Sequence, residues 1–320
     1  MTIDISQNNK PAASNQLMTL QDFFKNFGGQ IHNDFPAIHA PVFKSSQGTP
    51  YLTAPGAVLI AKPHVELSGV KNFLEGFDHG LGFASYLDDP AALSSGAQLC
   101  KIAGQTCYAS FSPKRTMNRE AERYFKNIME SGHGSVLEHA NYSFLLYGIS
   151  RSLTHELIRH RAGFGFSQLS QRYVSGRVLR FVERPEFQDG GKFHQMFLER
   201  IDRAYAEYHK LADALLAEQE HGTAILSAEA KTDLRKKVNQ AARGLLPNET
   251  ETIMVSTGNV RAWRHVIEMR ASDHSELEIR GLAVRVFLCL RQIEPILFGD
   301  YELHELPDGT HSVTTPNRKV

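Results

Sequence analysis

Three short apolar segments constrain the fold of this 320-residue chain most, because each has the length and composition of a buried strand. They cover residues 57–61, 140–149 and 251–257. Helical patterns are predicted at residues 17–27, 117–131, 150–160, 193–220, 227–245, 260–270 and 276–298. Strands and helices alternate irregularly, and no glycine-rich phosphate turn follows a strand. We therefore expect a mixed fold rather than a dinucleotide-binding fold.

The first 55 residues differ in character from the rest of the chain. Residues 1–16 are polar and predict a disordered arm. Residues 44–56 contain two prolines, two glycines and several hydroxyl side chains, which predicts a linker. We therefore expect a partly disordered N-terminal extension at residues 1–55 and a main domain at residues 56–320.

Composition disfavours several classes of protein. Lys and Arg number 35 and Asp and Glu number 35, so the chain is not the globally basic type that binds nucleic acid. No apolar run approaches the roughly 20 residues of a membrane span, and the first 16 residues do not resemble a signal peptide. Three cysteines are too few for a disulfide scaffold. We expect a cytoplasmic protein with neither a membrane nor a nucleic acid as partner.

Positive charge is nevertheless concentrated in one part of the chain. No lysine lies between Lys126 and Lys192, yet this window contains seven arginines. Between Ser150 and Arg184 only two acids oppose them, which leaves an excess of five positive charges. Arginine offers a planar fork of donors that lysine lacks. A local positive site in a neutral protein indicates a small anionic ligand.

The first candidate site is the Arg-His-Arg sequence at residues 159–161, followed by residues 170–172 (Ser-Gln-Arg). Residues 162–170 contain two glycines and two serines and are predicted to be a loop. Arginine forks, hydroxyls and the backbone N–H groups near Gly163 and Gly165 suit a phosphate monoester. In the alternative interpretation, the arginines bind the last carbonyls of the helix and nearby surface acids.

The second candidate site is a predicted helix, residues 260–270, that follows a strand. Asn259 and Arg261 lie at its amino end, where backbone donors also point outward. Arg270 lies at the other end. In the alternative interpretation this is a surface helix with Trp263 packed inside, and spacing alone does not decide between the two.

Metal and thiol chemistry are not predicted. Four histidines fall between residues 133 and 160, but His155 and His160 are five apart, or about 140° around a helix, and do not share a face. Cys289 lies in an apolar helix and is expected in the core. Cys107 is also expected to pack against its aromatic neighbours. Neither cysteine has the adjacent activating group that a covalent mechanism needs.

Residues 159–173 resemble the flavin-dependent thymidylate synthases, whose signature is R-H-R, seven or eight residues, then Ser. Residues 132–139 (GHGSVLEH) and 258–274 (GNVRAWRHVIEMRASDH) resemble two further motifs of that family, in the family's order. The resemblance covers roughly residues 57–315. It implies an α+β fold with one main domain, a central mostly antiparallel sheet flanked by long helices, and active sites at the subunit interfaces of a homotetramer.

The resemblance also implies an activity. It is the reductive methylation of dUMP to dTMP, with methylenetetrahydrofolate as carbon donor and NADPH as reductant through FAD. An alternative is a non-catalytic nucleotide-binding protein on the same scaffold, which would bind dUMP without turnover. An RNA-binding module fits less well, because the aromatic residues near the arginines lack a repeated stacking pattern.

Site residues follow from the resemblance position by position. The catalytic residue would be Arg270, which would polarise the uracil ring. The dUMP site would comprise Glu156, Arg159, Gln168, Leu169, Ser170, Gln171, Arg172, Arg243 and Arg270. The FAD site would comprise Ser110, His133, Ser135, Arg159, His160, Arg161, Gln168, Asn259, Arg261 and His265.

Three positions depart from the pattern of many family members. Glu156 stands in place of Gln, Gln168 in place of Glu and His265 in place of Asn. A carboxylate at position 156 would be unfavourable beside a phosphate unless it faces the base or a neighbouring arginine.

Overall fold

The computed structural model describes residues 19–320 except for 175, 221–227 and 319, so the arm predicted at residues 1–16 lies outside the described residues. Helices in the described part of the chain are α1 (Leu20–Asn26), α2 (Lys71–Glu75), α3 (Ser95–Thr106), α4 (Ala121–Glu130), α5 (Arg151–Leu157), α6 (Lys192–Glu220), α7 (Ala228–Ala242), α8 (Val260–Arg270) and α9 (Leu277–Ile293). The strands there are β1 (Gly29–His32), β2 (Phe35–Ile38), β3 (Val42–Lys44), β4 (Pro50–Leu52), β5 (Gly56–Ala61), β6 (Asn141–Ser150), β7 (Phe164–Gln168), β8 (Phe181–Val182), β9 (Glu251–Asn259), β10 (Glu302–Glu305) and β11 (His311–Thr314).

The main sheet has six strands in the order β1-β2-β5-β6-β9-β7, and each neighbouring pair is antiparallel. The three predicted strands are confirmed as β5, β6 and β9, which lie in the middle of this sheet. Two smaller sheets, β3-β4-β8 and β10-β11, accompany it. The expected mixed fold with one domain and a mostly antiparallel central sheet is therefore confirmed.

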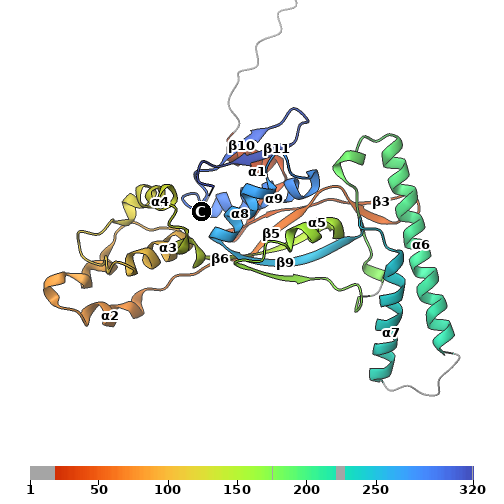
Figure 1. Ribbon diagram of the computed structural model, residues 1–320, viewed down its shortest axis with the longest axis horizontal. Helices are drawn as coiled ribbons and strands as arrows, with labels where there is room; N and C mark the ends of the chain where they lie inside the picture. The colour runs from red at the N-terminus through yellow and green to blue at the C-terminus, as the bar shows by residue number, and fades with distance from the viewer. Residues whose placement is uncertain (1–18, 175, 221–227, 319) are drawn as a thin grey trace, which may run out of the picture.

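One face of the sheet packs against α8 and α9 (Figure 1). Tyr142, Phe144 and Leu146 alternate along β6 and are buried on this face. Trp263 of α8 lies edge-on to Phe144, with 5.3 Å between ring centroids, and its indole N–H donates to the Tyr142 carbonyl at 3.1 Å. The long buried helix predicted at 276–298 is confirmed as α9, although it ends earlier, just before Pro295.

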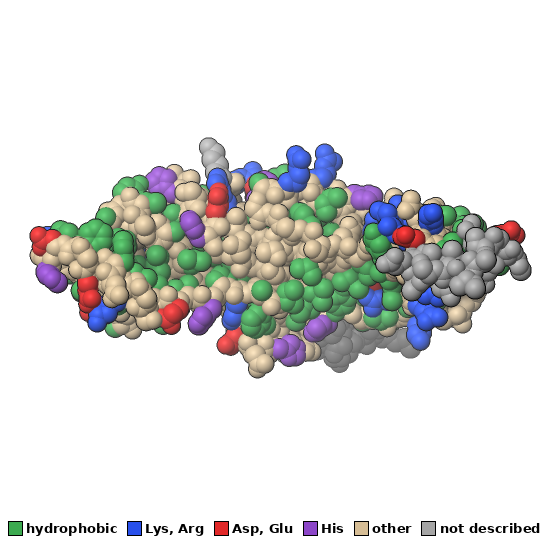
Figure 2. Space-filling model, turned by 90° about the horizontal axis from the view of Figure 1, so that it is seen from below, with side chains coloured by type: hydrophobic (Ala, Val, Ile, Leu, Met, Phe, Trp, Pro, Cys, Tyr) green, Lys and Arg blue, Asp and Glu red, His purple; other side chains and the backbone are tan. Residues whose placement is uncertain are grey.

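The opposite face of the sheet carries a row of apolar side chains. Val58, Leu145 and Val255 lie directly across from one another on β5, β6 and β9, and Ile253 lies two residues from Val255. All four are half-buried. In Figure 1 no helix of the described residues lies below the middle of the sheet, and Figure 2 shows hydrophobic side chains gathered on this lower side. We call Val58, Leu145, Ile253 and Val255 the open sheet face.

Two predictions of irregular structure were wrong. The linker predicted at residues 44–56 contains β4, which begins at Pro50, a position where a strand tolerates proline. The loop predicted at residues 162–170 contains β7, which pairs with β9 at the edge of the main sheet. Phe164 and Phe166 stack on one side of β7, so the alternation of Phe with Gly and Ser is a strand pattern that the glycines obscured.

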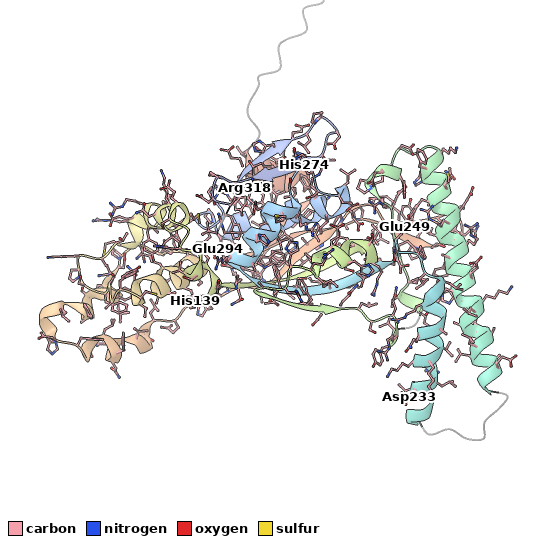
Figure 3. The ribbon with its side chains drawn as sticks, in the orientation of Figure 1. His139, Asp233, Glu249, His274, Glu294 and Arg318 are labelled. Carbon is pink, nitrogen blue, oxygen red and sulfur yellow. The ribbon has the colours of Figure 1, made fainter. Side chains whose placement is uncertain are left out.

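Segments outside the core of the sheet follow the predictions more closely. The helix predicted at 17–27 is confirmed as α1, and the one predicted at 117–131 as α4 with a 3₁₀ turn before it. α6 and α7 confirm the two long helices and form a hairpin beside the sheet, where Arg200 pairs with Glu249 at 2.5 Å (Figure 3). β1 and β2 place residues 29–38 in the main sheet.

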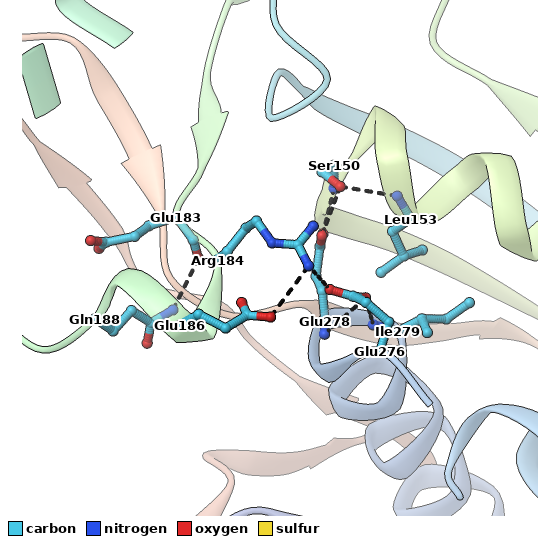
Figure 4. A network of polar contacts seen from close by, with 9 residues as sticks. All are labelled: Ser150, Leu153, Glu183, Arg184, Glu186, Gln188, Glu276, Glu278 and Ile279. Atoms are coloured by element: carbon cyan, nitrogen blue, oxygen red, sulfur yellow. Dashed lines mark hydrogen bonds and ion pairs between the residues drawn. The ribbon is translucent and has the colours of Figure 1, made fainter. Parts of the chain in front are cut away.

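A buried carboxylate ties α9 to the start of α5 (Figure 4). Glu278 is 2% exposed and accepts hydrogen bonds from the backbone N and the Oγ of Ser150, both at 2.7 Å. The same Oγ accepts from the backbone N of Leu153 and caps α5. Arg184 pairs with Glu276 beside this contact. α9 therefore holds the start of the helix that leads to the Arg-His-Arg sequence.

Glu278→Gln should change how stability depends on pH. Burial raises the pKa of Glu278 to about 7. A pKa raised in the folded state contributes stability that is complete below the unfolded pKa and is lost as pH rises through 7. Wild type should therefore lose up to about 3 kcal/mol relative to Glu278→Gln between pH 4.5 and 8. Thermal unfolding across this range measures it, with the exposed Glu302→Gln as control. Parallel pH profiles for wild type and Glu278→Gln would contradict the assignment.

Candidate active site

The two candidate clusters meet because of how their helices leave the sheet. α5 follows the end of β6, and α8 follows the end of β9, its antiparallel neighbour. α8 therefore starts at the far end of this strand pair and runs back toward α5. Asn259 caps α8, its Oδ1 accepting from the backbone N of Ala262 at 2.8 Å. The last residue of α8, Arg270, consequently reaches the end of α5.

Arg270 is the centre of a polar cluster. Its Nη1 donates to Glu156 Oε2 at 2.7 Å, and its Nε donates to His160 Nε2 at 2.9 Å. The Arg270 side chain is 23% exposed and that of Glu156 is 38% exposed, so the cluster opens to solvent. Two neighbours thus orient the guanidinium while leaving part of it accessible. Glu156 meets the condition expected for a carboxylate at this position, since it faces an arginine.

His160 acts here as a neutral acceptor. Burial, together with Arg270 and His265, lowers its pKa to about 4. Its ring lies 5.5 Å from that of His265 in an edge-to-face arrangement. Because Nε2 accepts from Arg270, the proton of the neutral ring resides on Nδ1. His160 therefore orients the Arg270 guanidinium without adding a second positive charge to the cluster.

Gln168 and Leu169 connect the end of β7 to α5 and β9 through hydrogen bonds. The Gln168 amide nitrogen lies 3.1 Å from Thr154 Oγ1 and 3.3 Å from Thr252 Oγ1, as donor to both. The backbone N of Leu169 donates to the carbonyl of Ile253 at 2.8 Å. These contacts fix the strand that leads into residues 170–172 against α5 and β9.

The predicted flavin residues other than Gln168 divide among three grooves. Arg159, His160, Arg161 and His265 line one of about 600 Å³. Asn259, Arg261 and His265 line an adjacent one of about 400 Å³, which shares Ala162 and Ala262 with the first. Ser110, His133 and Ser135 line a third of about 400 Å³ on the α3–α4 side. Within one chain, the predicted flavin residues do not share one cavity.

The predicted dUMP residues of the Ser-Gln-Arg sequence and Arg243 both lie in turns that follow an element. Ser170, Gln171 and Arg172 form the turn after β7, where Ser170 Oγ accepts from the backbone N of Arg172 at 3.4 Å. The Nε of Arg172 is buried and has no hydrogen-bond partner among the described residues. Arg243 lies in a 3₁₀ turn after α7.

Arg151 is a neighbour of Arg243 that the site prediction missed. Burial lowers the pKa of Arg151, and the charge of Arg243 lowers it further. No carboxylate in the described part of the chain forms an ion pair with either residue. Two adjacent arginines without a counter-charge form an anion site. The available signal was the lysine-free window, of which Arg151 is the first arginine.

The cysteines have different environments. Cys289 is fully buried, as predicted for a core residue. Cys107 is exposed, so the prediction that it packs against its aromatic neighbours was wrong. Tyr108 beside it is 78% exposed, because this turn after α3 faces outward.

Among the described residues, no group of three or more His, Cys, Asp and Glu side chains is arranged to hold a metal ion. None of the described helices combines the length and apolar character needed to cross a membrane.

Comparison with known proteins identifies relatives of the chain. Residues 91–296 match the family model described as thymidylate synthase complementing protein. The flavin-dependent thymidylate synthase of Mycobacterium tuberculosis strain H37Rv is 45% identical over 222 residues, which cover 69% of this chain and 86% of the relative. The flavin-dependent thymidylate synthases of Mycobacterium sp. strain JLS and Mycolicibacterium vanbaalenii are each also 45% identical, over 226 and 227 residues, with the same coverage.

Proposed function

Because the chain belongs to the flavin-dependent thymidylate synthase family, we infer that it converts dUMP to dTMP by reductive methylation. Methylenetetrahydrofolate is the carbon donor, and NADPH is the reductant through FAD. The observation that carries this function in the structure is the Arg270 cluster, in which Glu156 and His160 orient a partly exposed guanidinium. The protein is therefore a methyltransferase that depends on a flavin.

The residues present fit FAD. Arginine, histidine and asparagine donors surround the turn at Gly163, where φ is +75°. A Cβ at Gly163 would lie 2.8 Å from the Asn259 amide nitrogen and 2.9 Å from Ala262 Cβ, so glycine lets the turn approach the start of α8. Arg159 and Arg161 would bind the anionic parts of FAD, with Asn259, Arg261 and His265 on the other side of the turn. When bound, FAD supplies hydride transfer.

We assign dUMP to the Arg270 cluster and the arginines around it. Arg270 would donate to the uracil ring and stabilise negative charge that develops there, because a fixed cation needs no reorganisation during the reaction. His160, neutral and accepting, would keep the guanidinium in place without adding charge. Ser170, Arg172 and Arg243 would bind the phosphate, and Arg151 would assist them. Gln168 would hold β7 in position for these contacts.

We propose that the enzyme is a homotetramer whose active sites lie between subunits. Two observations support this arrangement. The open sheet face exposes apolar side chains that association would remove from water. The flavin residues line three grooves in one chain, which subunits placed side by side would combine. We further propose that residues 1–55 are an extension of the family's domain. We also propose a cytoplasmic location, which the three free cysteines support. The proposal includes no nucleic-acid partner.

The test of the function is spectroscopic and kinetic. The purified protein, incubated with FAD and then dialysed, should retain a visible flavin band. NADPH oxidation should depend on dUMP, and dTMP should form once methylenetetrahydrofolate is present. Binding of dUMP without NADPH oxidation would instead support the non-catalytic nucleotide-binding protein.

Ser170→Ala should weaken dUMP binding without abolishing turnover. The hydroxyl lies in the turn beside Arg172 and would contribute one hydrogen bond to the phosphate. Loss of one such bond to a charged group costs about 1.5–3 kcal/mol, or roughly a 10- to 150-fold increase in the Kd for dUMP. Titration calorimetry and the dUMP dependence of kcat measure this, with Ser131→Ala on α4 as control. Complete loss of activity at unchanged dUMP affinity would contradict the role.

A further inference from the structure

A pocket separate from the Arg270 cluster lies between α1, α9 and the β10–β11 hairpin. It has a volume of about 440 Å³. Its lining combines Phe23 of α1, Phe27 directly after α1, Arg285 of α9, Glu305 of β10 and His311 of β11 with Asn26, His39, Pro41 and Ala54. α1 lies outside the residues 91–296 that match the family model. The pocket is therefore built partly from a segment that the family match does not include.

Arg285 is a half-buried cation that forms no ion pair with a described carboxylate. Its Nη1 donates to the carbonyl of Gly281 at 3.0 Å, one helical turn earlier. Its Nε is buried without any acceptor, and no ion pair to Arg285 occurs within the described residues. Burial lowers its pKa to about 10. A desolvated guanidinium without an ion-pair partner raises the free energy of the folded protein, so an anion bound beside it would be stabilising.

The walls of the pocket favour a ring as well as an anion. The Arg285 guanidinium lies 4.9 Å from the centroid of the Phe27 ring. The His311 ring lies edge-on to both Phe23 and Phe27, with 5.2 Å between centroids in each pair. Aromatic edges and faces of this kind pack against a flat ring. The volume also exceeds what an isolated small anion such as acetate would fill.

The charged side chains around the pocket favour a ligand with a single negative charge. Burial has the largest effect on His311 and lowers its pKa, with Glu305 and Asp308 acting against it and Arg285 in the same direction. Glu305 is exposed on the same pocket and would repel a dianion. One arginine therefore has one charge to balance. The planar fork of a guanidinium binds carboxylate and phosphate alike. The Glu305 carboxylate favours the ligand with the smaller negative charge, a carboxylate.

We propose that this pocket binds a small carboxylate with a planar ring, its carboxylate on Arg285 and its ring against Phe23, Phe27 and His311. The ligand would join α1 to α9 and would stabilise the N-terminal part of the described chain. This pocket is distinct from the Arg270 cluster assigned to dUMP and from the grooves assigned to FAD. Its existence does not depend on the proposed catalytic function.

Benzoate binding to the full-length protein tests the proposal, with FAD and dUMP present to occupy their sites. At constant ionic strength, titration calorimetry should find one benzoate site per chain, and benzoate should raise the Tm. Acetate, which lacks the ring, should bind at least tenfold more weakly. Arg285→Met should lose binding by tenfold or more, and Arg285→Lys should weaken it to a smaller extent. Arg291→Met, on the same helix but outside this pocket, should bind benzoate as wild type does.

Several outcomes would overturn the proposal. Equal benzoate affinity in wild type and Arg285→Met would remove Arg285 from the site. Inorganic phosphate that binds this pocket as well as benzoate does would refute the choice of a carboxylate. Loss of the oligomer in Arg285→Met, with no effect of benzoate on wild type, would assign the missing anion to a neighbouring subunit. Each readout is separate from dUMP-dependent NADPH oxidation, so failure here leaves the catalytic proposal to its own test.

Discussion

Arg270→Ala should lower dTMP formation by about 100- to 1,000-fold while FAD remains bound. This range is the usual effect of removing one preorganised donor from an active site, about 2.7–4 kcal/mol. Arg270 holds the positive charge of its cluster, because His160 is neutral and Glu156 is its partner. Arg270 is not among the predicted flavin residues, so the flavin spectrum should persist. Single-turnover formation of dTMP and the visible spectrum measure the two effects.

Two further variants make the Arg270 result specific. Arg270→Lys keeps a positive charge but cannot donate to Glu156 and His160 together, so it should recover only a small part of the activity. Arg203→Ala removes an exposed arginine of α6 and should leave turnover unchanged. Turnover in Arg270→Ala within tenfold of wild type would contradict a catalytic role for the guanidinium.

Leu145→Asp should dissociate the proposed tetramer and, with it, release FAD and abolish turnover. Leu145 lies in the middle of the open sheet face, directly opposite Val58 and Val255 on the neighbouring strands. A carboxylate there would be buried without a partner on association, which costs several kcal/mol for each copy. Because flavin grooves are expected to combine across subunits, dissociation should remove the flavin band. Light scattering with size exclusion measures the mass, and absorbance measures the flavin.

Controls must separate dissociation from misfolding. Leu145→Thr introduces an uncharged, β-branched side chain that suits a strand and should weaken association less. Phe193→Asp places the same charge on α6 at an apolar side chain that is 52% exposed, outside the open sheet face, and should leave the mass unchanged. Circular dichroism should show native secondary structure for all three variants. A tetramer with bound flavin in Leu145→Asp would refute the role of this face.

The unusual carboxylate at position 156 has a physical explanation in the cluster. A glutamate near a bound phosphate would be repelled, but Glu156 lies 2.7 Å from a guanidinium donor. Its charge offsets that of Arg270 and fixes the direction of the side chain. The residue at this position therefore acts through Arg270, and its replacement by Gln would keep a hydrogen bond but remove the ion pair.

Much of the architecture could be predicted because it depends on local patterns. β5, β6 and β9 are short apolar runs, and the many apolar residues of α9 predict a buried helix. β7 was missed because an edge strand receives its hydrogen bonds from a neighbour that lies about 90 residues away in the chain. β4 was missed for a different reason: it pairs with nearby β3 as well as with distant β8, but its prolines and the glycine and serine residues around it have the composition of a linker.

Residue types alone identify the chemical groups of the site: the Arg-His-Arg run, the arginine window and Asn259 at the amino end of its helix. Which of these groups are in contact depends on how distant segments pack. Glu156, His160 and Arg270 meet because α5 and α8 leave opposite ends of two antiparallel strands, so one helix runs back toward the other. Burial likewise lowers the pKa of His160, which keeps it neutral, and the pKa of Arg285. Burial depends on contacts distant in sequence, whereas residue type and helical spacing are local.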